Sequence, residues 1–116
     1  MPSTMIYSRA AVILVPFPFT DLSGHKKRPG LVVSADSYNS GQDDLIIAQI
    51  SSQVDRPVPP DEYEIIDWKG SGLLFPSVVR PKLFTLESSL VIRALGHLAT
   101  QEMDEVDKRL RMVLAL

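Results

Sequence analysis

Four residues of one polar segment have the types needed for chemistry on a phosphate, namely His25, Lys26, Lys27 and Arg28. A guanidinium offers a planar fork of donors for phosphate oxygens, and a loop imidazole can give or take a proton near neutral pH. Pro29 keeps the residue before it out of the α region, so Arg28 would hold a fixed direction where the loop meets the next strand. Cations in a polar loop usually form only a solvated surface, so phosphate chemistry at Arg28 is a hypothesis at this point.

Ser51 and Ser52 are the second candidate pair, and they follow a predicted strand over residues 45–50. Serines at strand ends more often form turns than take part in catalysis, and neither lies in a Gly-x-Ser-x-Gly nucleophile motif. The second histidine, His97, lies in an apolar segment, and we expect it to be structural. The two hydroxyls alone therefore do not predict an activated nucleophile.

The composition excludes several kinds of site. The chain has no cysteine, which rules out disulfides, thiolate chemistry and zinc bound by cysteine. No spacing of histidines and carboxylates predicts a metal cluster, and there is no glycine-rich phosphate loop, so we expect neither a metal nor a cofactor. The net charge of −2 argues against broad coating of nucleic acid, whereas the basic residues around the candidate loop favour one specific phosphate contact.

No segment of the sequence predicts export or membrane insertion. The N-terminus lacks an apolar signal region, and the longest apolar run, residues 10–19, is too short to span a bilayer. We expect a cytoplasmic protein that makes no contact with a membrane.

Short apolar segments separated by turn residues dominate the chain. Residues 36–44 and 69–72 have turn chemistry, and the segment over 62–65 should form a half-exposed strand with its acids outward. The other predicted strands lie at residues 12–15, 30–34, 45–50, 73–80, 82–86 and 94–98. Strands at this spacing favour a sandwich or a barrel over βαβ units.

The C-terminal segment is the exception, because it has a helical pattern. Thr100 can cap a helix, acids fill its first turns and cations lie near its end. Met103, Val106 and Leu110 fall on one face, which should pack across the barrel. With 116 residues and no internal repeat or linker, the chain is predicted to be a single domain, residues 1–116, mainly β with a C-terminal α-helix.

Motifs around these candidates resemble one protein family. Residues 14–19 (Leu-Val-Pro-Phe-Pro-Phe), 21–24 (Asp-Leu-Ser-Gly) and 27–34 (Lys-Arg-Pro-Gly-Leu-Val-Val-Ser) look like the PemK branch of the MazF/PemK (Kid) toxin endoribonucleases. Further elements of that family resemble residues 48–51, 76–80 and 95–98. The resemblance covers almost the whole chain.

The resemblance implies an SH3-like barrel of the CcdB/Kid/MazF type, a homodimer, and a small cognate antitoxin as inhibitor. It also implies an activity, that of the toxin component of a type II toxin–antitoxin system. Such a toxin is a metal-independent, sequence-specific endoribonuclease, which cleaves single-stranded RNA by attack of the 2′-hydroxyl on the adjacent phosphate.

The resemblance also assigns roles to residues of this chain. Arg28 matches the family's catalytic arginine and Ser51 its catalytic Thr or Ser, while His25 and Arg80 resemble positions used in Kid-like members. We therefore expect catalysis from Arg28, Ser51 and His25. Substrate binding is expected from Lys26, Lys27, Ser52 and Arg80.

The chain departs from the family pattern at two places. Ala10 and Ala11 stand where a Gly-Asp or Gly-Glu pair is usual, and Lys82 stands where some members have an acid. The first departure bears on the support of the site, and the second leaves no acidic role at that position.

Two alternatives belong to the class of binding proteins. One is a catalytically weak relative such as a CcdB-like topoisomerase poison, but those proteins use a C-terminal Trp-Gly-Ile, whereas the only tryptophan here is Trp68. The other is an SH3-like peptide-binding module, which needs an exposed aromatic groove, and aromatic residues are only 7% of this chain.

Overall fold

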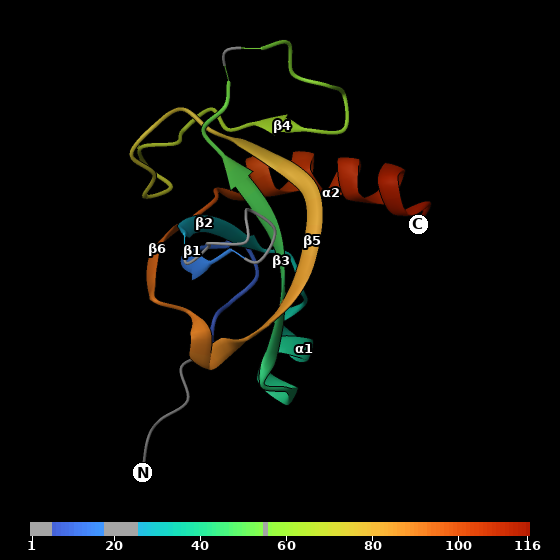
Figure 1. The fold of residues 1–116 in the computed structure, drawn as a ribbon. Helices are drawn as coiled ribbons and strands as arrows, with labels where there is room; N and C mark the ends of the chain where they lie inside the picture. Colours follow the sequence, from blue (N-terminus) through green and yellow to red (C-terminus); the bar gives the residue numbers. More distant parts are fainter. Residues whose placement is uncertain (1–5, 18–25, 55) are drawn as a thin grey trace.

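Six strands form one antiparallel sheet in the computed structural model, which describes residues 6–17, 26–54 and 56–116. The spatial order is β4-β5-β3-β2-β1-β6, so the sheet is open and curves as a half-barrel (Figure 1). The predicted class, a mainly β fold with a C-terminal α-helix and an SH3-like barrel, is confirmed, and the sheet takes the form of an open half-barrel. The strands are β1 Ala11–Pro16, β2 Lys27–Val32, β3 Asp44–Ser51, β4 Tyr63–Glu64, β5 Val78–Glu87 and β6 Arg93–His97. The helices are α1 Asp36–Gly41, the short η1 Ser88–Leu90 and α2 Thr100–Leu114.

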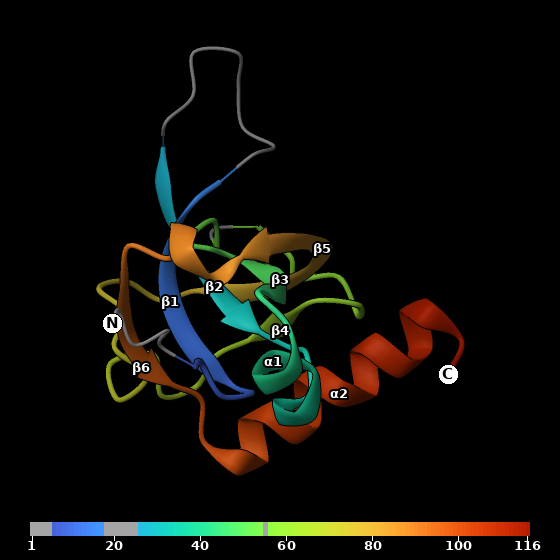
Figure 2. The same ribbon diagram turned by 90° about the horizontal axis from the view of Figure 1, so that it is seen from below.

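The central strands are buried on both faces, because apolar residues occupy successive positions in β1, β2 and β3. On one face, Val12, Leu31 and Ala48 pack with Met103 and Val106 of α2. The other face holds a second cluster: Tyr7, Ala11, Ile13, Val15, Phe17, Val32, Leu45, Ile47, Phe84 and Leu86. Figure 2 shows α2 and α1 together on one side of the curved sheet. The buried apolar positions of the central strands are thereby divided between two cores.

Helix α2 is fixed to the strand β4 region by a buried carboxylate. Glu102 accepts hydrogen bonds from the Tyr63 hydroxyl at 2.7 Å and from the backbone N–H groups of Ile66 at 2.6 Å and Asp67 at 3.2 Å. Burial, followed by the hydrogen bond to Glu102, raises the pKa of Tyr63 well above its ordinary value. The Glu102 carboxylate therefore accepts hydrogen bonds from backbone N–H groups of the loop after β4, which is not paired with another strand.

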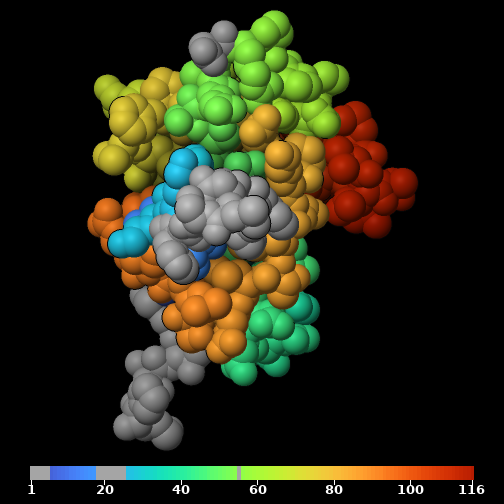
Figure 3. Space-filling view, viewed as in Figure 1, coloured from blue at the N-terminus to red at the C-terminus, as the bar shows by residue number. Residues whose placement is uncertain are grey.

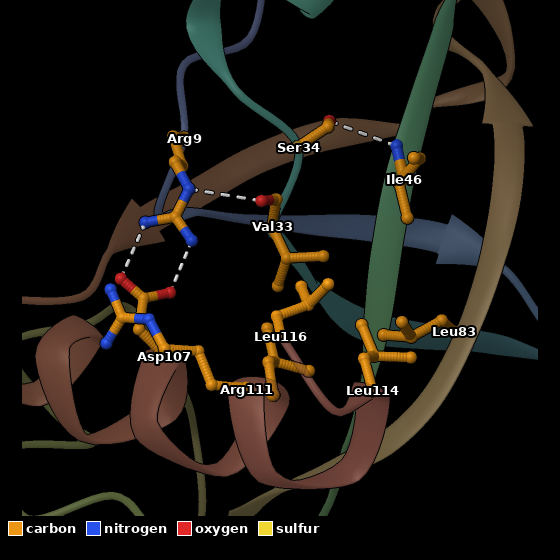
Figure 4. A pocket seen from close by; sticks show the side chains of 10 residues that line it. Arg9, Val33, Ser34, Ile46, Leu83, Asp107, Arg111, Leu114 and Leu116 are labelled. Carbon is orange, nitrogen blue, oxygen red and sulfur yellow. Dashed lines mark hydrogen bonds and ion pairs between the residues drawn. The ribbon is translucent and has the colours of Figure 1, made fainter.

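A guanidinium joins the start of the chain to the same helix. Arg9 makes a bidentate ion pair with Asp107 and donates from Nε to the Val33 carbonyl at 3.1 Å. Figure 4 shows this pair among the side chains that line a pocket of about 450 Å³ between α2 and the sheet. The pocket floor is mostly aliphatic, with Ile46 and Leu83 opposite Leu114. Beyond this contact the C-terminal half of α2 projects from the side of the molecule (Figure 3).

The second strand begins earlier than the sequence pattern predicted. We expected a strand over 30–34 with Arg28 at the junction of loop and strand, but β2 already starts at Lys27 and ends at Val32. Pro29 is opposite Leu14 in the ladder with β1, while the ladder with β3 covers only Gly30 to Val32. Pro29 has no backbone N–H to donate, but it lies where β2 extends beyond its ladder with β3. The strand therefore tolerates the proline.

Other details of the secondary structure and of side-chain burial also differ from the expectation. Residues 36–41 form α1 rather than a turn, and the segments at 73–80 and 82–86 are represented by one strand, β5, which starts only at Val78. Glu62 is buried rather than outward, because it binds two arginines. Ala99 is the N-cap of α2, and Thr100 is its first helical residue. His97, expected to be structural, is exposed on β6. No described helix is long and apolar enough to cross a bilayer.

Candidate functional site

A small polar pocket of about 190 Å³ opens at one end of the sheet and gathers three of the predicted site residues. Arg28 comes from β2, Ser51 from the end of β3 and Arg80 from β5. The rest of the lining is Phe17, Gln49, Gln53 and Lys82. These residues are spread over positions 17 to 82 of the sequence and meet because β2, β3 and β5 are neighbours in the sheet, so the pocket is a product of strand order.

The alternation of side chains explains why these residues meet. Ile47 belongs to the second apolar cluster, and Gln49 and Ser51 follow it at steps of two on the same face of β3. Arg28 shares a face of β2 with Val32 of the same cluster. Continuing the register of Gly30 with Gln49 by two residues places Arg28 opposite Ser51. The pocket is thus the polar end of one face whose remainder is apolar.

Gly30 supports this packing. A Cβ built at this glycine would lie 2.6 Å from the Ile47 side chain and 3.6 Å from that of Val15. A residue with a Cβ would push the Ile47 side chain aside, whereas the contact with Val15 would be an ordinary one. The Gly that follows Arg28-Pro29 therefore serves close packing of the strands.

A bulge in β5 brings two cations to the pocket. The register changes from Ala48 opposite Leu83 to Gln49 opposite Arg80, so Pro81 and Lys82 are left without partners on β3. Arg80 and Lys82 are two residues apart, so their side chains would point to the same face of a regular strand. The bulge changes which residues of β3 lie next to that face of β5. Both side chains line the pocket.

The pocket is electropositive and has no acidic residue in its lining. Arg28, Arg80 and Lys82 supply three cations. Of these three, Arg80 is paired with a carboxylate, that of Glu62, which accepts from Arg80 Nε at 3.3 Å and from Arg56 at 2.7 Å. This pairing fixes one edge of the Arg80 guanidinium, so an anion can use the remaining donors.

Ser51 is buried and oriented. Its Oγ accepts a hydrogen bond from the backbone N–H of Gln53 at 3.2 Å. Because the Ser51 oxygen acts as the acceptor in this contact, the hydroxyl proton is still available for donation. Ser51 is therefore suited to donate to a phosphate oxygen.

Two buried side-chain atoms of the pocket have no hydrogen-bond partner among the described residues, namely Arg28 Nε and Gln49 Oε1. An unpaired buried polar atom is costly, so each calls for a partner other than the residues that the structure describes. Sequence reasoning missed Gln49. The available signal was a polar residue inside the otherwise apolar strand over 45–50.

Lys26, Lys27 and Ser52, which were also predicted, do not line this pocket. Lys27 and Ser52 are each one residue from a pocket residue and line a larger cavity of about 500 Å³ on the other face, together with Arg28 and Arg93. Lys26 is exposed and lines neither cavity. His25 lies outside the described residues. Within the described ranges, no group of three His, Asp or Glu residues could hold a metal ion.

Comparisons with known proteins converge on one group. Residues 8–114 match the family of PemK-like, MazF-like toxins of type II toxin–antitoxin systems. Endoribonuclease EndoA of Bacillus subtilis (strain 168) is 32% identical over 90 residues, which cover 77% of this chain and 77% of EndoA.

Solved structures of low sequence identity share the fold. An endoribonuclease in complex with its cognate antitoxin, from a mycobacterial species, superposes with a TM-score of 0.76 at 22% identity, covering 95% of this chain and 96% of that one. The MazE–MazF structure (Form-III) from Deinococcus radiodurans also gives 0.76, at 19% identity, with 97% and 99% covered.

Proposed function

The chain belongs to the family of PemK-like, MazF-like toxins of type II toxin–antitoxin systems, and from this premise we propose that it is an endoribonuclease that cleaves single-stranded RNA without a metal ion. The observation that carries the proposal is the meeting of Arg28, Ser51, Arg80 and Lys82 in one pocket that has no acid in its lining. EndoA, which is named an endoribonuclease, supports the same activity.

The proposed reaction is an internal transfer. The 2′-oxygen of one ribose bonds to the adjacent phosphorus, the bond from phosphorus to the 5′-oxygen breaks, and the products are a 2′,3′-cyclic phosphate and a 5′-hydroxyl. One proton leaves the 2′-hydroxyl and one reaches the leaving oxygen. The enzyme must therefore align the strand, offset charge on the phosphate and assist proton transfer.

We assign the charge-offsetting role to Arg28, since a guanidinium stays protonated and presents a fork of donors to the phosphate oxygens. Ser51 donates to a phosphate oxygen, and Arg80 binds the phosphate electrostatically from β5. His25 is the proposed acid or base, because imidazole titrates near neutral pH. The predicted binding residues Lys26, Lys27 and Ser52 would contact the RNA beyond the scissile phosphate, around the same end of the sheet; Lys27 and Ser52 line the larger cavity there.

The test is incubation of the purified protein with a mixed RNA in EDTA, followed by sequencing of the new ends. We expect cleavage at a recurring short sequence, with 5′-hydroxyl ends. RNA left intact would favour a binding protein of the same fold. Cleavage that requires added magnesium would contradict the metal-independent reaction.

We further propose a homodimer that pairs through apolar side chains near the site. Leu74 and Phe75 line the larger cavity and are 81% and 63% exposed, and neighbouring exposed apolar side chains of this kind are typical of an interaction surface. Light scattering at micromolar concentration should give twice the 12.9 kDa of one chain. Leu74→Asp should shift the mass towards the monomer, whereas Met112→Asp, at the exposed end of α2, should not. A monomeric unsubstituted protein would contradict the dimer.

A cognate antitoxin is the proposed inhibitor, in the form of a disordered acidic and apolar segment that folds over the site. Three cations and exposed apolar side chains lie at the same end of the sheet, which suits such a segment. A partner encoded beside this chain should protect the amides of residues 26–30 from hydrogen exchange and stop cleavage at matching stoichiometry. Protection confined to α2, with cleavage intact, would contradict this mode of inhibition.

We also propose that residues 1–116 form one domain that acts in the cytoplasm. The family match over residues 8–114 supports the single domain. Messenger RNA in the cytoplasm would be the accessible substrate.

A further inference from the structure

Gln49 carries an acceptor atom that no function assigned so far uses. The residue lies in β3 between Ile47 and Ser51 on the pocket face, and only 8% of its surface is exposed. Its Oε1 is buried without a partner among the described residues. Burying an unpaired amide oxygen lowers stability, and an apolar residue would fill the position at less cost.

The second unpaired atom of the pocket narrows the choice of ligand. Arg28 Nε is a donor and Gln49 Oε1 is an acceptor, and they are not bonded to each other. A ligand that satisfies both must bring an acceptor for the arginine and a donor for the glutamine. A phosphodiester supplies acceptors only, so phosphate binding leaves Gln49 unpaired.

Ribose next to a phosphate supplies the missing donor. The 2′-hydroxyl lies on the carbon beside the one that carries the 3′-phosphate, so a phosphate held by Arg28 brings this hydroxyl into the same small pocket. Deoxyribose has no such group. The two orphaned atoms together therefore match the attacking nucleotide of RNA.

We propose that Gln49 Oε1 accepts a hydrogen bond from the 2′-hydroxyl of the scissile nucleotide, which selects RNA over DNA and orients the nucleophile. This inference rests on the function proposed above. Gln49 takes no proton in the reaction, because an amide oxygen is not a base at neutral pH. It holds the hydroxyl so that a lone pair of the 2′-oxygen faces phosphorus.

The test compares two stable probes in binding to unsubstituted protein and to Gln49→Leu. Each probe is a short RNA of the sequence upstream of the mapped cut and ends in a 3′-phosphate, with ribose or 2′-deoxyribose as the last sugar. Unsubstituted protein should bind the ribose probe about fivefold to tenfold more tightly, as one hydrogen bond allows. With Gln49→Leu this ratio should fall to about one, because only the ribose probe loses affinity.

Gln53→Leu is the matched control. Gln53 is an exposed glutamine of the same pocket, and only its backbone N–H contacts Ser51. This variant should keep the ratio of the unsubstituted protein. Single-turnover cleavage by Gln49→Leu should be at least tenfold slower, while its melting temperature should be equal or higher, since a nearly isosteric apolar group replaces an unpaired acceptor.

The possible outcomes distinguish a failure of the role proposed for Gln49 from a failure of the proposed endoribonuclease function. If the unsubstituted protein leaves RNA intact, the proposed function fails and this inference fails with it. If RNA is cut but Gln49→Leu keeps the ratio between the probes, only the role of Gln49 is wrong. A lower melting temperature for Gln49→Leu with the ratio unchanged would make Gln49 a structural residue.

Discussion

Arg28→Lys is expected to lower single-turnover RNA cleavage at least a hundredfold while leaving the melting temperature nearly unchanged. A lysine keeps the charge but has a single ammonium, so it loses the fork of donors that spans two phosphate oxygens. Losses of about this size follow the removal of one donor that stabilises charge in a transition state. The fold should be unaffected, because Arg28 Nε has no partner in the described structure.

Lys27 provides the control for this substitution. It is the neighbour of Arg28 in β2 but lines the cavity on the other face. Lys27→Ala should weaken RNA binding severalfold, with a larger loss at low salt than at high salt, and change the rate of the bound complex little. Retention of the full cleavage rate by Arg28→Lys would show that the guanidinium has no special role in the transition state.

Glu102→Ala is expected to have the largest effect on stability, a loss of about 3 kcal/mol in the free energy of unfolding by urea. The substitution leaves the Tyr63 hydroxyl and the N–H groups of Ile66 and Asp67 without their acceptor. Tyr63→Phe removes one of these three hydrogen bonds and should cost about 1 kcal/mol. Asp104→Ala, at an exposed position of the same helix, should change stability by less than about 0.5 kcal/mol.

The pKa of Tyr63 gives a second readout of the same contact. Its pKa is raised in the folded state by burial and then by Glu102, so its stabilising contribution is complete below the ordinary tyrosine pKa. The contribution is lost as the pH rises from that value towards the folded-state pKa. Tyrosinate absorbance of Glu102→Ala should therefore appear at lower pH than in the unsubstituted protein. An unchanged titration and unchanged stability would mean that Glu102 does not anchor this loop.

The sequence alone was enough to select Arg28 and Ser51. An arginine before Pro-Gly and a serine after an apolar strand are local features, and the resemblance to one family gave them roles. Glu102 was read only as an acid in the first turns of a helix, because its partners at positions 63, 66 and 67 are distant in sequence. Sequence patterns report which groups are polar but not which donors they meet.

Strand boundaries were predicted less well where polar residues belong to strands. Lys27 and Arg28 look like loop residues, yet they extend β2 because its ladder with β1 continues to Pro16. Residues 36–41 have turn composition, yet they form α1, in which Asn39 donates to the backbone carbonyls of Tyr7 and Ser34. In both cases a tertiary contact outweighed local propensity.

The sequence by itself determined the mainly β class, the C-terminal helix, the family, and the arginine and serine that we propose as the core of the site. These depend on local pattern, such as alternation, helical spacing and the residues around a proline. Only the tertiary structure decided that Ser51 and Ser52 lie on opposite faces, that the bulge in β5 sets where Arg80 and Lys82 meet β3, and that Gln49 is buried beside Arg28. The physical reason is that side-chain direction in a sheet depends on strand register, and register is set by pairing between distant segments.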